Sequence, residues 1–139
     1  MDYVIQLAAS FIAVVIVLTL HEFAHSFVAV KCGDPTPKWN GRLTLNPLKH
    51  FDLIGLICFA LVGFGWAKPV PINPNNFKKY RTGMALTACA GVGMNYLTAF
   101  LIYPFYLAVL YYLYPVLPSY SYTFLVDLFS LIFAYSLSF

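Results

Sequence analysis

Two histidines and a glutamate fall within five consecutive residues, His21-Glu22-Phe23-Ala24-His25. On an α-helix, His21 and His25 are one turn apart along the axis and about 40° apart around it, so both imidazoles can reach one metal ion. Glu22 lies at the edge of that face, where its carboxylate can contact a water molecule without binding the metal. The spacing therefore predicts a metal site with a general base beside it.

Zinc suits two neutral imidazoles, and a catalytic zinc site combines three protein ligands with one position open to water. Zinc would lower the pKa of that water and polarise a peptide carbonyl. Glu22 would accept the proton of the water and pass it to the departing amine. The residue types at this spacing thus predict hydrolysis of a peptide bond, with His21 and His25 as two of the zinc ligands.

The helix that carries this motif is expected to lie in a membrane. Residues 11–20, just before it, include one hydroxyl group and no charge, and the whole chain is 61% hydrophobic and 9% charged. An ordinary soluble domain is about 25% charged. Ionisable groups inside a membrane helix cost about 3 kcal/mol each on insertion scales, so packing alone explains this motif poorly. We therefore interpret it as functional.

The basic residues mark loops between hydrophobic runs. All 8 Lys and Arg residues lie between Lys31 and Arg81, an arrangement that the positive-inside rule explains better than nucleic-acid binding does. We expect an integral, multi-pass protein of the cell membrane that contacts the lipid bilayer and binds no nucleic acid.

The hydrophobic runs predict an all-α membrane protein with three to four transmembrane or re-entrant helical segments. Runs over 3–30, 83–117 and 120–139 are long enough to cross a bilayer, which takes about 20 residues. The shorter run 51–67 is flanked by basic loops on both sides, which favours a re-entrant segment. Alternating apolar and polar residues over 41–46 predict a short β-strand or hairpin at membrane depth.

Four motifs occur along the chain. They are HEFAH on a predicted membrane helix, GRLTLNPLKHFDLIG at 41–55, GWAKPVPINPNNF at 65–77 and AGVGMN at 90–95. In this combination the chain resembles the site-2 protease family of intramembrane zinc metalloproteases. Val92 departs from that family's Ala-Gly-Pro-x-x-Asn motif by replacing its proline. The resemblance covers nearly the whole chain, and it implies that residues 1–139 form a single transmembrane metalloprotease core.

The resemblance implies a function for the first motif. His21 and His25 would bind one zinc ion per chain, and Glu22 would be the catalytic acid and base. The protein would hydrolyse peptide bonds in or near transmembrane segments of its substrate proteins.

The resemblance also implies two substrate contacts. Asn95, which matches the asparagine of the family motif, would help to hold the substrate. The expected strand at Leu43, Thr44 and Leu45 would pair with an unwound substrate segment by strand addition.

The third zinc ligand is missing from the pattern. The family takes it from the aspartate of a Leu-Asp-Gly motif on a later helix, and no Leu-Asp-Gly occurs here. We therefore expect a chain truncated at its C-terminus before that motif, or a member that lost the ligand. Asp127, the only acidic residue after Asp52, is the substitute candidate, although a residue at a membrane face is the plainer interpretation. His50 is expected to be a hydrogen-bonding residue of its loop.

Two other functions stay open. A catalytically inactive relative would bind partner segments through the same strand without hydrolysing them. A redox or transport protein with two histidine ligands is a weaker alternative. Haem in membranes usually takes its ligands from two facing helices, whereas His21 and His25 share one face of one helix. Zinc content separates these functions.

Overall fold

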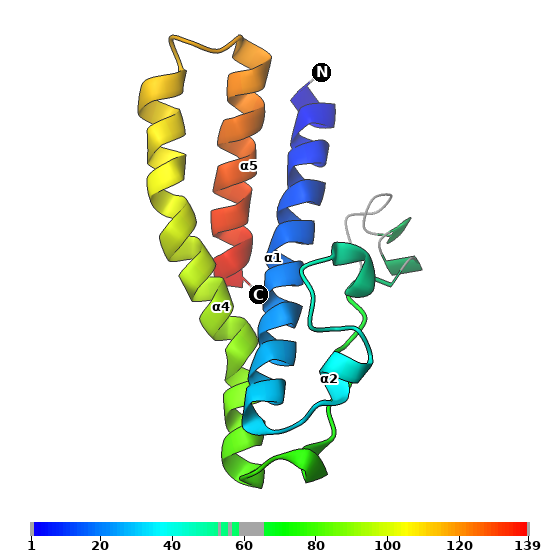
Figure 1. The fold of residues 1–139 in the computed structure, drawn as a ribbon. Helices are drawn as coiled ribbons and strands as arrows, with labels where there is room; N and C mark the ends of the chain where they lie inside the picture. The colour runs from blue at the N-terminus through cyan, green and yellow to red at the C-terminus, as the bar shows by residue number, and fades with distance from the viewer. Residues whose placement is uncertain (1, 53, 56, 59–65, 139) are drawn as a thin grey trace. The chain divides into compact units, whose positions relative to one another are not determined.

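Three long helices dominate the structure, a computed structural model that describes residues 2–52, 54–55, 57–58 and 66–138 (Figure 1). They are α1 (Asp2–Cys32), α4 (Tyr80–Ala108) and α5 (Ser119–Ser138). Each is long and apolar enough to cross a membrane, which is compatible with a multi-pass membrane protein and confirms the predicted all-α class. The re-entrant segment expected over 51–67 lies largely outside the described residues.

Several short helical pieces accompany the long helices. They are α2 (Thr36–Trp39), the 3₁₀ turns η1 (Pro47–Lys49) and η2 (Pro74–Asn76), and a π-helical turn η3 (Val109–Leu113) that continues α4. An isolated antiparallel bridge joins Phe51 to Ala67. The chain divides into two units, which are described separately: Leu18–Met94, called the motif unit, and Met1–Val17 with Asn95–Phe139, called the helical unit.

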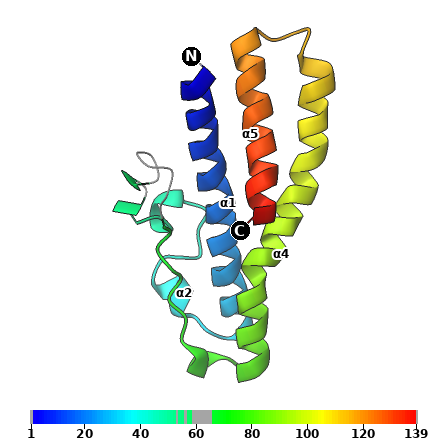
Figure 2. The same ribbon diagram turned by 180° about the vertical axis from the view of Figure 1, so that it is seen from behind.

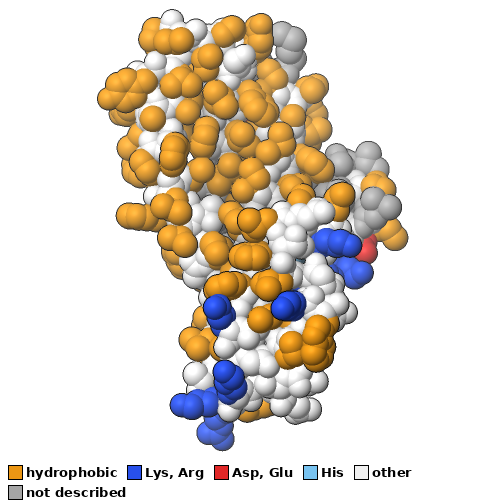
Figure 3. All heavy atoms as spheres, in the orientation of Figure 1, with side chains coloured by type: hydrophobic (Ala, Val, Ile, Leu, Met, Phe, Trp, Pro, Cys, Tyr) orange, Lys and Arg blue, Asp and Glu red, His pale blue; other side chains and the backbone are white. Residues whose placement is uncertain are grey.

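The helical unit packs the first part of α1, the last part of α4 and α5 side by side, as both views show (Figures 1 and 2). Its core is formed by Ala13, Val17 and Ile132, which are at most 3% exposed. The Ser10 hydroxyl and the Tyr135 hydroxyl hydrogen-bond at 2.7 Å. Hydrophobic side chains cover much of the surface in Figure 3, whereas Lys and Arg occur on the motif unit alone. Such an apolar exterior suits a lipid environment.

In the motif unit, α1 ends where a distant segment of the chain returns to it. Gly33 has a φ of 115°, in the left-handed region that favours glycine at a helix end. A β-carbon at Gly33 would lie 3.0 Å from the carbonyl oxygen of Asn76. The Lys78 amide donates a hydrogen bond to the Cys32 carbonyl at 3.0 Å. The last turn of α1 is therefore capped by the segment that leads into α4.

A buried carboxylate strengthens this junction. Asp34 is 0% exposed, and its Oδ2 atom accepts a hydrogen bond from the Asn73 amide at 2.8 Å. Its Oδ1 atom accepts from the Asn76 side chain at 2.9 Å, and from the amide and hydroxyl of Thr36 at 3.0 and 2.5 Å. Asp34 thus fixes segment 73–76 against the start of α2.

The strand predicted over 41–46 is absent, and this part of the prediction is wrong. Local side-chain bonds engage the backbone there instead. Nε2 of His50 donates to the Thr44 carbonyl at 2.7 Å, and the Asn46 amide donates to the Thr44 hydroxyl at 3.2 Å. Oδ1 of Asn46 accepts from the Leu48 amide at 3.0 Å and starts η1. Such bonds compete with the backbone hydrogen bonds of a strand. An alternation of apolar and polar residues does not reveal this competition.

The Asp34 junction predicts an acid-sensitive fold. Burial acts to raise the pKa of Asp34, but hydrogen bonds from Thr36, Asn76 and Asn73 hold this pKa below its ordinary value of 3.8. The ionised form is therefore favoured by folding, and its contribution is lost as the pH falls through the folded pKa. We expect stability to fall below about pH 4. Asp34→Asn should cost about 2 kcal/mol at pH 7 and flatten this acid dependence.

Thermal unfolding of the detergent-solubilised protein, measured from pH 7 to pH 3, tests this expectation. A midpoint that falls equally steeply in wild type and in Asp34→Asn would assign the acid sensitivity to another group.

Candidate metal centre

His21 and His25 are neighbours on α1, with ring centroids 4.7 Å apart and ring planes inclined by 70°. Both side chains are half-buried. This proximity follows directly from helix geometry, because residues four apart lie on one face. The two imidazoles can therefore serve the same ligand.

Gly91 on α4 faces both imidazoles. A β-carbon at Gly91 would touch Nε2 of His21, and it would lie 2.5 Å from Nε2 of His25. Both Nε2 atoms thus lie against the same face of Gly91, and this approach needs a residue without a side chain. Zinc–nitrogen bonds are about 2.0–2.1 Å long. The two Nε2 atoms therefore lie close to each other, and neighbouring imidazoles of this kind fit zinc.

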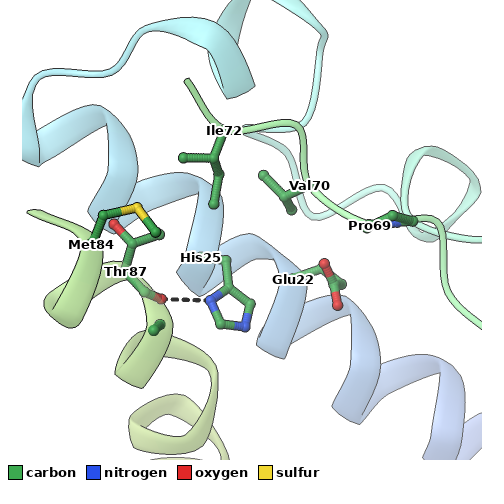
Figure 4. Close-up of a pocket in the computed structure, with 8 residues that line it drawn as sticks. Glu22, His25, Pro69, Val70, Ile72, Met84 and Thr87 are labelled. Atoms are coloured by element: carbon green, nitrogen blue, oxygen red, sulfur yellow. Dashed lines mark hydrogen bonds between the residues drawn. The ribbon is translucent and has the colours of Figure 1, made fainter. Parts of the chain in front are cut away.

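The hydrogen bond made by His25 also suits a metal ligand. Its Nδ1 atom lies 2.6 Å from the backbone carbonyl of Thr87 on α4 (Figure 4). A carbonyl oxygen only accepts, so Nδ1 carries the hydrogen and Nε2 is the ring nitrogen left to bind a metal. Metal-binding histidines are commonly oriented by such a second bond. Sequence reasoning missed Thr87, because the contact joins residues 62 positions apart.

Small residues on one face of α4 allow its close approach to other parts of the motif unit. A β-carbon at Gly83 would lie 2.6 Å from the ring of Phe77. Thr87 and Gly91 follow at four-residue spacing on the same helix face, and both contact the histidines of α1. Small residues at this spacing let membrane helices pack closely. This spacing is the sequence signal that could have pointed to both residues.

A cavity of about 270 Å³ opens beside the motif. Glu22 and His25 form its α1 wall, and Figure 4 shows the segment with Pro69, Val70 and Ile72 opposite them. The remaining lining residues come from α4: Met84, Thr87 and Ala88. The cavity therefore places one carboxylate and one imidazole against mainly apolar walls.

The other predicted site residues occupy different positions. Asn95 lies one turn after Gly91 on α4 and is 2% exposed. Its side-chain amide has no hydrogen-bond partner among the described residues. Leu43, Thr44 and Leu45 lie in the loop where the expected strand is absent. The substrate-binding roles of these residues stay predictions.

A third protein ligand is not evident in the described part of the chain. No group of three His, Cys, Asp or Glu side chains suited to a metal ion occurs there. Asp127 lies on α5, in the helical unit, and its ligand role stays a prediction. The described residues thus bring two imidazoles together, and a metal site there stays a prediction.

A known protein with a similar sequence bears on this chemistry. The chain is 47% identical over 103 residues to "Putative zinc metalloprotease YwhC" of Bacillus subtilis (strain 168). This similarity supports a zinc metalloprotease family. The match covers 74% of the chain and 46% of that protein, so the chain spans about half the length of this relative. No family model and no solved structure matches the chain.

Proposed function

We propose that the protein is an intramembrane zinc metalloprotease of the site-2 type. It hydrolyses peptide bonds in or near the transmembrane segments of substrate proteins, and it works within the lipid bilayer. The observation that carries this proposal is the convergence of the Nε2 atoms of His21 and His25 at Gly91. The two histidines lie on α1, a helix apolar enough to span a membrane. The similarity to a zinc metalloprotease supports it.

His21 and His25 would hold the zinc ion through their Nε2 atoms. When bound, zinc supplies a Lewis acid that polarises the scissile carbonyl and makes water a stronger nucleophile. The Thr87 carbonyl keeps the His25 ring in the orientation and tautomer that this binding needs. Asp127 is the third-ligand candidate that this chain offers.

Glu22 would carry the proton through the reaction. Its carboxylate borders the cavity next to His25, so it can accept a proton from the attacking water and return it to the leaving amine. Apolar side chains around the cavity limit bulk water, which strengthens the electrostatic effect of the carboxylate. The scissile bond is expected to enter this cavity.

Zinc removal tests the proposal. We expect the purified protein to contain about one zinc ion per chain. In lipid vesicles it should cleave a synthetic probe peptide of about 20 apolar residues with a central Asn-Gly pair. A zinc chelator should stop cleavage, and added zinc should restore it.

Histidine variants complete this test. His21→Ala and His25→Ala should each abolish zinc binding, whereas His50→Gln should retain it, because His50 bonds to the Thr44 carbonyl instead. Cleavage that continues without zinc would overturn the proposed mechanism. Bound zinc without any cleavage would favour an inactive, partner-binding protein.

A further inference from the structure

We propose that segment 69–72 is the edge along which an extended substrate peptide pairs with the protein. The inference rests on the proposed proteolytic function and assigns its substrate-docking site. It uses a different segment from the loop 43–45, where the structure has no strand.

The sequence Pro69-Val70-Pro71-Ile72 is confined to extended backbone. Proline fixes its own φ and pushes the residue before it towards extended conformations. Pro71 constrains Val70 in this way, and Asn73, which precedes Pro74, has φ −109° and ψ 102°. In an extended chain, alternate residues direct their amide and carbonyl groups to the same edge. Val70 and Ile72 thus share one edge, while the prolines, which lack an N–H group, share the other.

The protein itself holds both ends of the segment. Arg42 is 6% exposed, and its guanidinium donates to the carbonyls of Lys68 and Pro69 at 3.3 and 3.4 Å, and also to that of Lys49. The Lys68 amide donates to the His50 carbonyl at 2.8 Å. These contacts fix the start of the segment, and the Asn73 amide, which donates to Asp34 at 2.8 Å, fixes its end on the proline edge.

Beyond Lys68, the edge formed by Val70 and Ile72 is available for pairing. The amide and carbonyl groups of Val70 and Ile72 form no hydrogen bond with any residue that the structure describes. Both residues are half-buried, so a second extended chain could approach them. An unpaired row of amide and carbonyl groups is the feature that strand addition uses.

This edge lies next to the proposed chemistry. Val70 and Ile72 line the same cavity as Glu22 and His25 (Figure 4). A peptide paired with the edge would therefore pass the carboxylate and the imidazole. Met84 and Ala88 add apolar wall to the cavity, so an apolar substrate side chain fits it best. A helical substrate has no free backbone groups, so the segment to be cut must unwind first.

Proline substitutions test the pairing, because Val70→Pro and Ile72→Pro each remove one amide donor from an already extended segment. Val70→Thr keeps that amide and nearly the same side-chain shape. We expect kcat/KM for the probe peptide to fall about 10-fold further in Val70→Pro than in Val70→Thr. Zinc content should be equal in the two proteins.

Cross-linking gives a second readout that needs no turnover. Ile72→Cys is introduced into a Glu22→Gln protein in which Cys32, Cys58 and Cys89 are replaced by serine. Single cysteines are then moved along the probe peptide. Strand pairing should give disulfides at every second probe position.

The outcomes separate the two proposals. Equal cleavage by Val70→Pro and Val70→Thr, or cross-links with a helical period, would overturn the docking site alone, provided that wild-type cleavage depends on zinc. Cleavage independent of zinc and Glu22 would overturn the proposed function.

Discussion

Glu22→Gln is expected to lower kcat for the probe peptide about 10²–10⁴-fold and to leave the zinc content unchanged. The amide of glutamine has nearly the shape of the carboxylate, but it cannot accept a proton from the attacking water. Glu22 borders the cavity without belonging to the histidine pair, so the metal ligands stay intact. Steady-state cleavage and zinc analysis of the same preparation measure both effects.

Asp52→Asn is a matched control for this change, because Asp52 accepts backbone hydrogen bonds from Ile54 and Gly55 and does not line the cavity. It should cleave the probe at the wild-type rate. Should Glu22→Gln also cleave at the wild-type rate, another group must move the proton. Should it lose zinc, Glu22 would have to be assigned as a ligand.

Gly91→Ala is expected to weaken zinc binding by more than about 100-fold and to abolish cleavage with it. Its methyl group would lie at the point that both Nε2 atoms face, 2.5 Å from that of His25. The imidazoles would have to turn away or the helices would have to separate. Zinc titration with a competing chelator measures the loss of affinity.

Gly93→Ala is the control, because outside the adjoining part of its own helix no atom of the described residues lies within 4 Å of a β-carbon at Gly93. Alanine favours helix over glycine by about 1 kcal/mol, so this variant should bind zinc normally and gain slightly in thermal stability. Normal zinc affinity in Gly91→Ala would show that the ion is held away from Gly91.

The predictable part of the site is its local part. His21 and His25 form a pair because four residues make about one helical turn, and the spacing alone reveals this. Likewise the three long helices follow from continuous apolar runs, because each run is long enough to cross a bilayer. Both patterns depend on neighbours in the sequence.

The parts that escaped prediction depend on contacts between distant residues or on particular side-chain bonds. Thr87 and Gly91 meet the histidines across two helices, and only their small size and spacing hint at this. The alternation over 41–46 suggested a strand, but bonds from His50 and Asn46 satisfy that backbone locally.

The junction between Cys32 and Lys78 has a consequence for helix register. Small residues at four-residue spacing on α4 would tolerate a slip of one turn, about 5.4 Å, along α1. Such a slip would exchange Gly91 for a neighbour of different size opposite the histidines. The bond from Lys78 to the end of α1 lies two residues before α4 begins, and so short a tether leaves no slack for sliding. The junction thereby fixes the alignment that keeps Gly91 opposite the histidines.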